Sequence, residues 1–422
     1  MPQTPRDLDV VLFGATGFVG ELTAAHVRDH APEGLRVALA GRSRAKLDSV
    51  ADRLGGAAAG WERVVIDAGD GAAWDELAAR TKVVATTVGP YVRYGREVVR
   101  ACAEAGTHYC DLTGEVLFVR DVADAFHEVA QCTGAKIVPS CGFDSIPSDL
   151  GVLATAEAAK ERGHGELLST TLFVRRLKGG LSGGTIDSMR QQAIMAREDE
   201  VARRAVADPY GLSPDRSAEP SGREGLPADT PPRPSGPLAK ITKALPVRRA
   251  DDGSWTGPFV MASYNTRVVR RSNALLGYAY GRGFRYQEVT DFGRSLKAPV
   301  MATGMTAGLL GLVAGMSFGP TRTLLDKALP APGEGPSAED RAKGRFAMEV
   351  VAQTTSGTEV RTTVAAPYDP GYNGTAIMLG QATLSLAGDE LDGEGGVLTP
   401  AVALGDHLIA RLRRFGFTIE TA

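Results

Sequence analysis

A glycine-rich turn near the start of the chain has the residue types and spacing that bind the phosphates of a nucleotide. Gly14, Gly17 and Gly20 recur at every third position of Gly14-Ala-Thr-Gly-Phe-Val-Gly20, directly after an apolar run at residues 9–13. The first glycine permits a tight turn, the second lets the backbone approach a pyrophosphate, and the third lets helix and strand pack closely. We therefore expect this loop to contact a dinucleotide through Gly14, Ala15, Thr16, Gly17, Phe18 and Gly20.

The residues after the second apolar run indicate which dinucleotide is bound. An NAD-specific site places an acid there for the ribose 2′-hydroxyl, but this sequence has Arg42, Ser43, Arg44 and Lys46. These residues offer cations and a hydroxyl to a 2′-phosphate, so the sequence favours NADP(H). The alternative is that the basic residues only solvate the start of a helix.

Three further residues stand where the cofactor should pass. Asp67 ends the third apolar run, where an acid can bond the adenine amino group. Val88 and Gly89 end the fourth run, at the edge along which a dinucleotide lies in this kind of sheet.

A parallel sheet is needed to bring these residues to one edge, and the first 150 residues have its pattern. Short apolar runs alternate there with segments of helical spacing. Strands that alternate with helices of about 10–15 residues are typical of βαβ units. We predict an α/β fold with an N-terminal Rossmann-type parallel sheet, forming an NADP-binding domain at residues 1–150.

The rhythm changes after Leu150. A longer strand is expected at residues 168–176 and a helix at 183–207, followed by an irregular insertion at 208–258 that is rich in Pro, Gly and Ser. We assign residues 151–395 to a second, α+β substrate domain. Residues 396–422 should contribute a C-terminal helix that packs back on the NADP-binding domain.

The composition narrows the classes of protein. The chain has 422 residues, and its 47 Lys+Arg against 50 Asp+Glu give a net charge of −3, which provides no field for nucleic acid. The four cysteines form no C-x-x-C pair and no metal-ligand cluster with histidine, so we expect neither a metal site nor a disulfide framework. The N-terminus has no apolar signal region. A cytoplasmic protein is expected.

Common catalytic motifs are missing. No Tyr-x-x-x-Lys pair occurs, which disfavours the short-chain dehydrogenases, and there is neither a Ser/His/Asp elbow nor a His-Glu-x-x-His motif. The remaining constellation is Asp111-Leu-Thr-Gly-Glu115 with Ser140-Cys-Gly-Phe-Asp-Ser-Ile-Pro-Ser-Asp149. Both segments follow predicted strands, so both should project near the nicotinamide.

At this point the sequence resembles a known family. The glycine-rich loop, Thr87-Val-Gly-Pro-Tyr91, Tyr109-Cys-Asp-Leu-Thr-Gly-Glu115 and Cys141-Gly-Phe-Asp-Ser-Ile-Pro-Ser-Asp149 resemble the saccharopine dehydrogenase-like oxidoreductases. Phe259-Val-Met-Ala, Tyr264-Asn-Thr-Arg-Val-Val-Arg-Arg-Ser-Asn273 and Gly396-Val-Leu-Thr-Pro-Ala-Val-Ala-Leu-Gly-Asp406 are most similar to the actinobacterial trans-acting enoyl reductases. The resemblance implies reduction of an enoyl thioester during polyketide or long-chain lipid synthesis, with the substrate presented by a carrier domain of a polyketide synthase.

The resemblance also implies site residues. Asp111 and Cys141 match the positions that lie near the reacting carbon in saccharopine reductases. The segment here reads Gly-Phe-Asp-Ser-Ile-Pro-Ser-Asp instead of the family's Gly-Leu-Asp-Pro-Gly-Ile-Asp-His, so the polar array for an amino-acid substrate is absent. This departure argues against saccharopine formation.

Enoyl reduction needs a hydride at the β-carbon, donors for the enolate oxygen and a proton for the α-carbon. Tyr91 is the first candidate donor, and Asp144, Ser145 and Cys141 are alternatives. Tyr91 could instead pack its ring beneath the nicotinamide, and Asp144 and Asp149 could cap the helix that begins near Ile146.

Two segments have open interpretations. Residues 300–319 carry no charge, and could be a membrane span, a buried helix or a surface in peripheral contact with membrane or lipid. Arg267, Arg270 and Arg271 could receive the phosphopantetheine or the acidic surface of a carrier protein, or form the solvated face of a strand. Two other functions also stay open, namely reduction of a carbonyl or imine, and non-catalytic binding of NADP and lipid.

Overall fold

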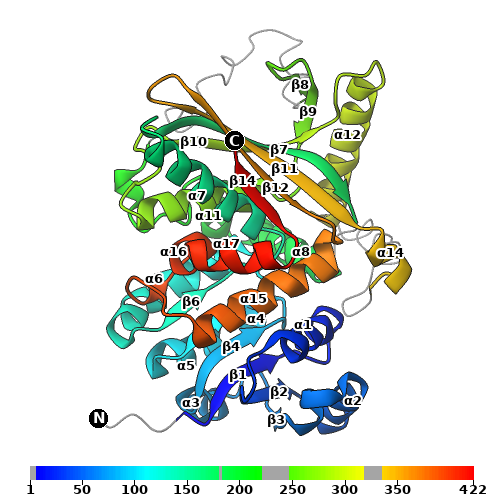
Figure 1. Cartoon of the computed structure of the whole chain (residues 1–422), viewed down its shortest axis with the longest axis vertical. Helices are drawn as coiled ribbons and strands as arrows, with labels where there is room; N and C mark the ends of the chain where they lie inside the picture. The colour runs from blue at the N-terminus through cyan, green and yellow to red at the C-terminus, as the bar shows by residue number, and fades with distance from the viewer. Residues whose placement is uncertain (1–5, 180–182, 221–246, 318–334) are drawn as a thin grey trace.

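The computed structural model describes residues 6–179, 183–220, 247–317 and 335–422, which form two seven-stranded sheets (Figure 1). In sheet A every neighbouring pair is parallel, in the order β13-β6-β5-β4-β1-β2-β3. Its strands are β1 (Leu8–Phe13), β2 (Val37–Gly41), β3 (Glu62–Val65), β4 (Thr81–Thr86), β5 (His108–Cys110), β6 (Lys136–Val138) and β13 (Gly396–Val397). The predicted Rossmann-type parallel sheet is confirmed.

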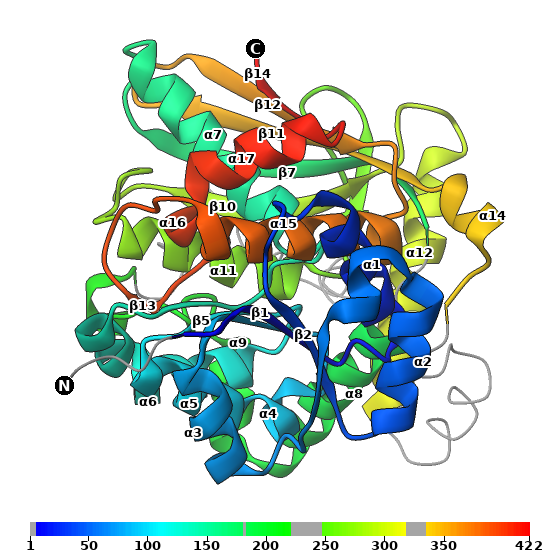
Figure 2. The same ribbon diagram turned by 60° about the horizontal axis from the view of Figure 1, so that its bottom comes forward.

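Helices cover both faces of sheet A. Those that connect its strands are α1 (Phe18–His30), α2 (Arg44–Leu54), α3 (Gly71–Ala79), α4 (Tyr91–Tyr94), α5 (Arg96–Ala105) and α6 (Val116–Thr133). Gly106 and Gly134 adopt left-handed conformations that end α5 and α6. Figure 2 shows α1 beside α15 (Thr375–Gly388) on one face, with α3, α5 and α6 on the other, and α15 also contacts β4 and β5. A helix from late in the chain therefore completes the cover of the N-terminal sheet.

Sheet B is mixed. Its order is β14-β12-β11-β7-β10-β9-β8, and only β7 and β10 pair in parallel. Its strands are β7 (Leu167–Lys178), β8 (Arg248–Arg249), β9 (Trp255–Pro258), β10 (Arg285–Asp291), β11 (Arg345–Thr354), β12 (Glu359–Ala366) and β14 (Thr418–Thr421). Buried and accessible residues alternate along β11 and β12, and α7 (Ile146–Glu161) packs against the sheet.

The remaining helices of the described residues surround the two sheets. They are α8 (Gly183–Glu198), α9 (Glu200–Ala207), α11 (Ala262–Leu275), α12 (Ala298–Ser317), α14 (Ala338–Ala342), α16 (Pro400–Ala403) and α17 (Gly405–Arg414). No helix in the described part of the chain, α12 included, is long and apolar enough to span a membrane.

Two segments differ from the sequence interpretation. The tail does more than supply one helix, because β13 joins β6 in sheet A while β14 joins β12 in sheet B. Within the insertion at 208–258, β9 pairs with β10, and residues 221–246 lie outside the described residues. Both differences arise from pairing with distant strands, which a local pattern does not reveal.

Candidate functional site

The glycine-rich loop between β1 and α1 has no room for a side chain at Gly14 or at Gly20. Gly14 has a φ of +90°, and a Cβ there would lie 2.7 Å from a methyl group of Val88. A Cβ on Gly20 would lie 2.1 Å from the carbonyl oxygen of Gly14, so the first turn of α1 packs directly on the loop. These contacts are the ones expected of a dinucleotide loop.

The N-terminus of α1 is open toward this loop. Its N-cap residue, Gly17, has no side chain to accept hydrogen bonds from the first turn, so those N–H groups are available to a phosphate. Ala15 is buried and Thr16 is exposed. The ring of Phe18 meets the ring of Tyr372 edge-on at 5.2 Å, which fixes the wall of the loop against the segment before α15.

The basic residues predicted to bind a 2′-phosphate lie together after β2. Arg42 and Lys46 are exposed, and neither forms an ion pair with any residue that the structure describes. Ser43 caps α2 by accepting the N–H of Lys46 at 3.4 Å. Arg44 differs, because it pairs with Asp48 at 3.2 Å. Arg42, Ser43 and Lys46 therefore fit the extra phosphate of NADP(H).

The other predicted cofactor residues lie on the same edge of sheet A. Asp67 is exposed after β3, and one carboxylate oxygen accepts the N–H of Gly69 at 3.0 Å. Val88 is half-buried and Gly89 exposed after β4, next to Gly14. Because β3, β2, β1 and β4 are neighbours, these positions and the glycine loop border one continuous edge.

Among the predicted catalytic residues, Tyr91 is already engaged. Its buried hydroxyl donates to the Thr86 carbonyl at 3.3 Å and accepts from the Leu112 N–H at 3.2 Å. Burial raises the pKa of this hydroxyl well above its usual value. The contacts join the ends of β4 and β5, which favours a structural role for the Tyr91 hydroxyl over a catalytic one.

Asp111 is fully buried and joins the loops after β5 and β6. It accepts the N–H groups of Thr113 and Ser140, both at 2.9 Å, and the hydroxyl of Tyr109 at 2.7 Å. Burial raises the pKa of the carboxyl to about 7. Because it accepts from three donors, Asp111 positions the loops after β5 and β6 through these neighbours.

Cys141 and Ser145 are buried as well. The Cys141 thiol donates to the Val138 carbonyl at 3.3 Å, and burial raises its pKa well above the usual value, so it is a neutral packing residue. Ser145 donates to the side-chain oxygen of Asn265 at 3.3 Å. Neither group is placed as a free donor.

Asp149 does not cap its own helix, contrary to one interpretation of the sequence. Its carboxylate accepts the N–H of Ala401 at 2.8 Å and the hydroxyl of Ser272. It thereby caps the short helix α16, which packs against α7. The N-cap of α7 is Ser145, which makes no side-chain capping bond.

Asp144 is the half-buried member of the five predicted catalytic residues, and it lines a cavity of about 400 Å³. The apolar part of the lining is the larger part and includes Phe143, Val174, Leu177, Phe259, Val260 and Leu309. Arg175, Arg176 and Asp291 also line the cavity, and Arg175 pairs with Asp291 at 2.7 Å. A mostly apolar cavity with few polar groups is typical of a site for a small organic substrate.

This cavity lies close to the cofactor edge. Pro370 and Gly371 line it, and the next residue, Tyr372, packs on Phe18 at the phosphate loop. A single turn at residues 370–374 thus borders both the phosphate loop and the apolar cavity. Asp144 enters the cavity from the loop after β6, at the carboxyl edge of the same sheet.

The sequence did not predict Tyr264 as a site residue. The hydroxyl of Tyr264, on α11, forms a short hydrogen bond with the hydroxyl of Ser140 at the end of β6. Ser140 has a φ of +69°, which is uncommon for a non-glycine residue and often marks a functional position. Tyr264 stood within a recognised motif, but 124 residues separate the pair, so no local signal links them.

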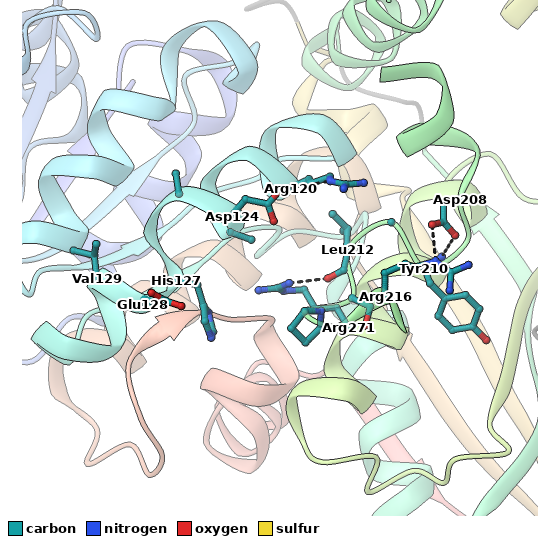
Figure 3. A pocket seen from close by; sticks show the side chains of 15 residues that line it. Arg120, Asp124, His127, Glu128, Val129, Asp208, Tyr210, Leu212, Arg216 and Arg271 are labelled. Carbon is teal, nitrogen blue, oxygen red and sulfur yellow. Dashed lines mark hydrogen bonds and ion pairs between the residues drawn. The ribbon is translucent and has the colours of Figure 1, made fainter. Parts of the chain in front are cut away.

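Arg267, Arg270 and Arg271 are buried in helix α11, so the interpretation of a solvated strand is wrong. They donate to main-chain carbonyls of residues 206–212, and Arg271 also reaches Val397. Figure 3 shows Arg271 bonded to the Leu212 carbonyl in a second, polar cavity of about 370 Å³. Each guanidinium group donates to at least two main-chain carbonyls and is buried, which argues against a role in receiving a carrier's phosphate.

No cluster of three or more His, Cys, Asp or Glu side chains that could hold a metal occurs in the part of the chain that is described.

Known relatives match this chain over its whole length. Residues 10–138 match the family model of the saccharopine dehydrogenase NADP-binding domain. A trans-acting enoyl reductase of Mycobacterium tuberculosis is 44% identical over 427 residues, which cover 100% of this chain and 99% of that protein. The trans-acting enoyl reductase of Mycobacterium ulcerans is 43% identical over the same shares of both chains. Among solved structures, saccharopine dehydrogenase (L-Glu forming) of Saccharomyces cerevisiae has a TM-score of 0.55 at 13% identity, covering 98% of this chain and 99% of the other.

Proposed function

Because the chain belongs to the saccharopine dehydrogenase-like oxidoreductases, in the branch of the trans-acting enoyl reductases, we propose that it reduces the carbon–carbon double bond of an enoyl thioester. It is an NADP-dependent oxidoreductase. The substrate is an acyl thioester presented by a carrier domain of a polyketide synthase. This partner agrees with the words trans-acting in the names of its relatives.

One observation of the site carries the proposal. The cavity that Asp144 lines is mostly apolar and is bordered by the same turn that packs on the phosphate loop. An enoyl chain is apolar apart from its thioester, so it matches this lining.

The chain would hold NADPH through the glycine loop, the open N-terminus of α1, and Arg42, Ser43 and Lys46. When bound, NADPH supplies the hydride. The apolar lining excludes water from the enoyl group, which strengthens polar interactions with the developing enolate.

We assign two roles around the enolate. Ser140 and Tyr264 are buried and bonded to each other, outside the residues that line the cavity, so the pair positions the loop after β6 from which Asp144 enters the cavity. Burial raises the pKa of Tyr264 well above its usual value, which keeps that hydroxyl protonated. Asp144, at the cavity wall, relays a proton from solvent to the α-carbon.

The test is NADPH oxidation with matched enoyl, keto and imine substrates, with product masses measured. We expect turnover of the enoyl thioester, a fall of about 10²–10⁴-fold in kcat for Asp144→Asn, and a smaller fall for Tyr264→Phe, which acts through the position of the loop. Tyr280→Phe is the matched control, because Tyr280 is equally buried and its hydroxyl has no partner among the described residues. Turnover of only the keto or imine substrate contradicts the proposal.

A further inference from the structure

Helix α12 carries an exposed apolar row that begins inside the apolar cavity. Met305 and Leu309 line the cavity, and Met301 lies one turn nearer the start of the helix. Residues four apart share a helix face, so Leu309, Met305 and Met301 form one row, named here the methionine row. Met305 is 53% exposed and Met301 57% exposed. The row therefore runs from the cavity to the surface without a break.

The surroundings of the row are apolar and open. Leu296 is 97% exposed and Val300 73% exposed, which extends the apolar surface past the start of α12. Gly304 and Gly308 have nothing within 4 Å of the position that a Cβ would take. Residues 298–317 contain no charged side chain. Figure 1 shows α12 at the margin of sheet B, next to β9.

Single exposed apolar residues are ordinary, but a contiguous row that continues a cavity marks a binding surface. Methionine is flexible and polarisable, so it adapts to ligands of different shape. The occupant must be apolar and elongated, because it enters the cavity past Leu309 and Met305 and leaves along Met301. An alkyl chain satisfies both conditions.

We propose that the methionine row binds the distal part of the substrate's alkyl chain after the chain has filled the cavity. Assignment of the thioester end rests on the proposed function, whereas the chain-binding row rests on the cavity and on α12.

The experiment measures binding without reduction. Saturated acyl-pantetheine thioesters of increasing chain length are titrated into the full chain by calorimetry, so no turnover is needed. Affinity should rise about fourfold for each added methylene, which corresponds to about 0.8 kcal/mol, and should keep rising for chains too long for the cavity.

Met301→Gln should weaken binding of the longest chains about tenfold and leave the shortest unchanged, because only a long chain reaches that residue. Ala307→Gln is the matched control, since Ala307 is exposed on the opposite side of α12 from the row. Equal affinities of wild type and Met301→Gln for every chain overturn the proposal, as does an equal loss in the control.

Two further outcomes test the methionine row and the proposed function separately. Length-dependent binding together with no turnover of any enoyl substrate supports the methionine row and contradicts the proposed function. Sedimentation with phosphatidylglycerol vesicles that is lost in Met301→Gln, with acyl-pantetheine binding unchanged, makes the row a membrane surface and overturns the proposal.

Discussion

Two basic clusters in this chain have similar residue types and opposite environments. Arg42 and Lys46 are exposed after β2 and have no ion pair with a described residue. Arg267, Arg270 and Arg271 are buried in α11 and bonded to main-chain carbonyls. The side chains of the first cluster are accessible to a phosphate, whereas those of the second are buried and already donate to main-chain acceptors. Burial and existing partners, and not the number of cations, decide whether a basic cluster is a ligand site.

A substitution in the buried cluster should lower the free energy of unfolding. Arg271→Ala leaves the carbonyls of Leu212 and Val397 without their donor, so we expect a loss of about 3–5 kcal/mol in the free energy of unfolding. Urea denaturation measures this loss, and the NADPH affinity of the folded protein should not change. A loss below about 1 kcal/mol, or weaker NADPH binding, would contradict the distinction between the buried and the exposed cluster.

Burial should govern acids in the same way. Because the pKa of Asp111 is raised to about 7, the native state binds more protons than the unfolded state between pH 4 and pH 7. Asp111 therefore contributes stability below its unfolded pKa that is lost as the pH rises through about 7. Asp111→Asn removes this dependence, so it should gain on wild type by up to about 4 kcal/mol between pH 4 and pH 8.

Urea denaturation of both proteins at several pH values measures that difference. Parallel stability curves for wild type and Asp111→Asn would mean that burial does not perturb this carboxyl. The comparison between buried and exposed charges would then hold for the arginines alone.

The exposed cluster should affect cofactor choice and leave stability alone. Arg42→Ala removes a guanidinium from the 2′-phosphate, so the KM for NADPH should rise about 10–100-fold while that for NADH stays the same. Arg44→Ala is the matched control, because Arg44 already pairs with Asp48. An equal rise in the control, or an equal rise with NADH, contradicts the assignment.

Lys46 should contribute least to the binding of NADPH. A lysine ammonium acts as a single point charge at an exposed position, so Lys46→Ala should raise the KM for NADPH about fivefold. Steady-state kinetics at low and high salt check this, since an exposed contact weakens with salt. An effect larger than that of Arg42→Ala would reverse the ranking within the exposed cluster.

Much of sheet A could be predicted from the sequence because its signals are local. Helix α1 (Phe18–His30) follows the glycine loop directly, and Ser43, a residue type that favours the N-cap position, caps α2. The residues around Arg267 were misinterpreted because Val268 and Val269 favour strands, whereas tertiary packing places them in α11. The pairing of β13 and β14 with two different sheets has no local signal.

The residues of the candidate site also differ in whether a local signal predicts them. The phosphate loop and Arg42 follow directly from spacing and residue type. Tyr91, Cys141 and Ser145 stand in recognisable segments, yet their partners come from other strands and helices. The contact between Tyr264 and Ser140 depends on how α11 docks against β6, so only the folded chain reveals it.

The most direct test of the central claim follows a deuterium label from the cofactor. The protein is incubated with NADPH carrying deuterium at the transferable C4 position and with an enoyl thioester, and the product is analysed by mass spectrometry and NMR. We predict a saturated thioester with one deuterium at the β-carbon. Deuterium at a former carbonyl or imine carbon of a competing substrate, or an enoyl thioester recovered without label, would contradict the claim.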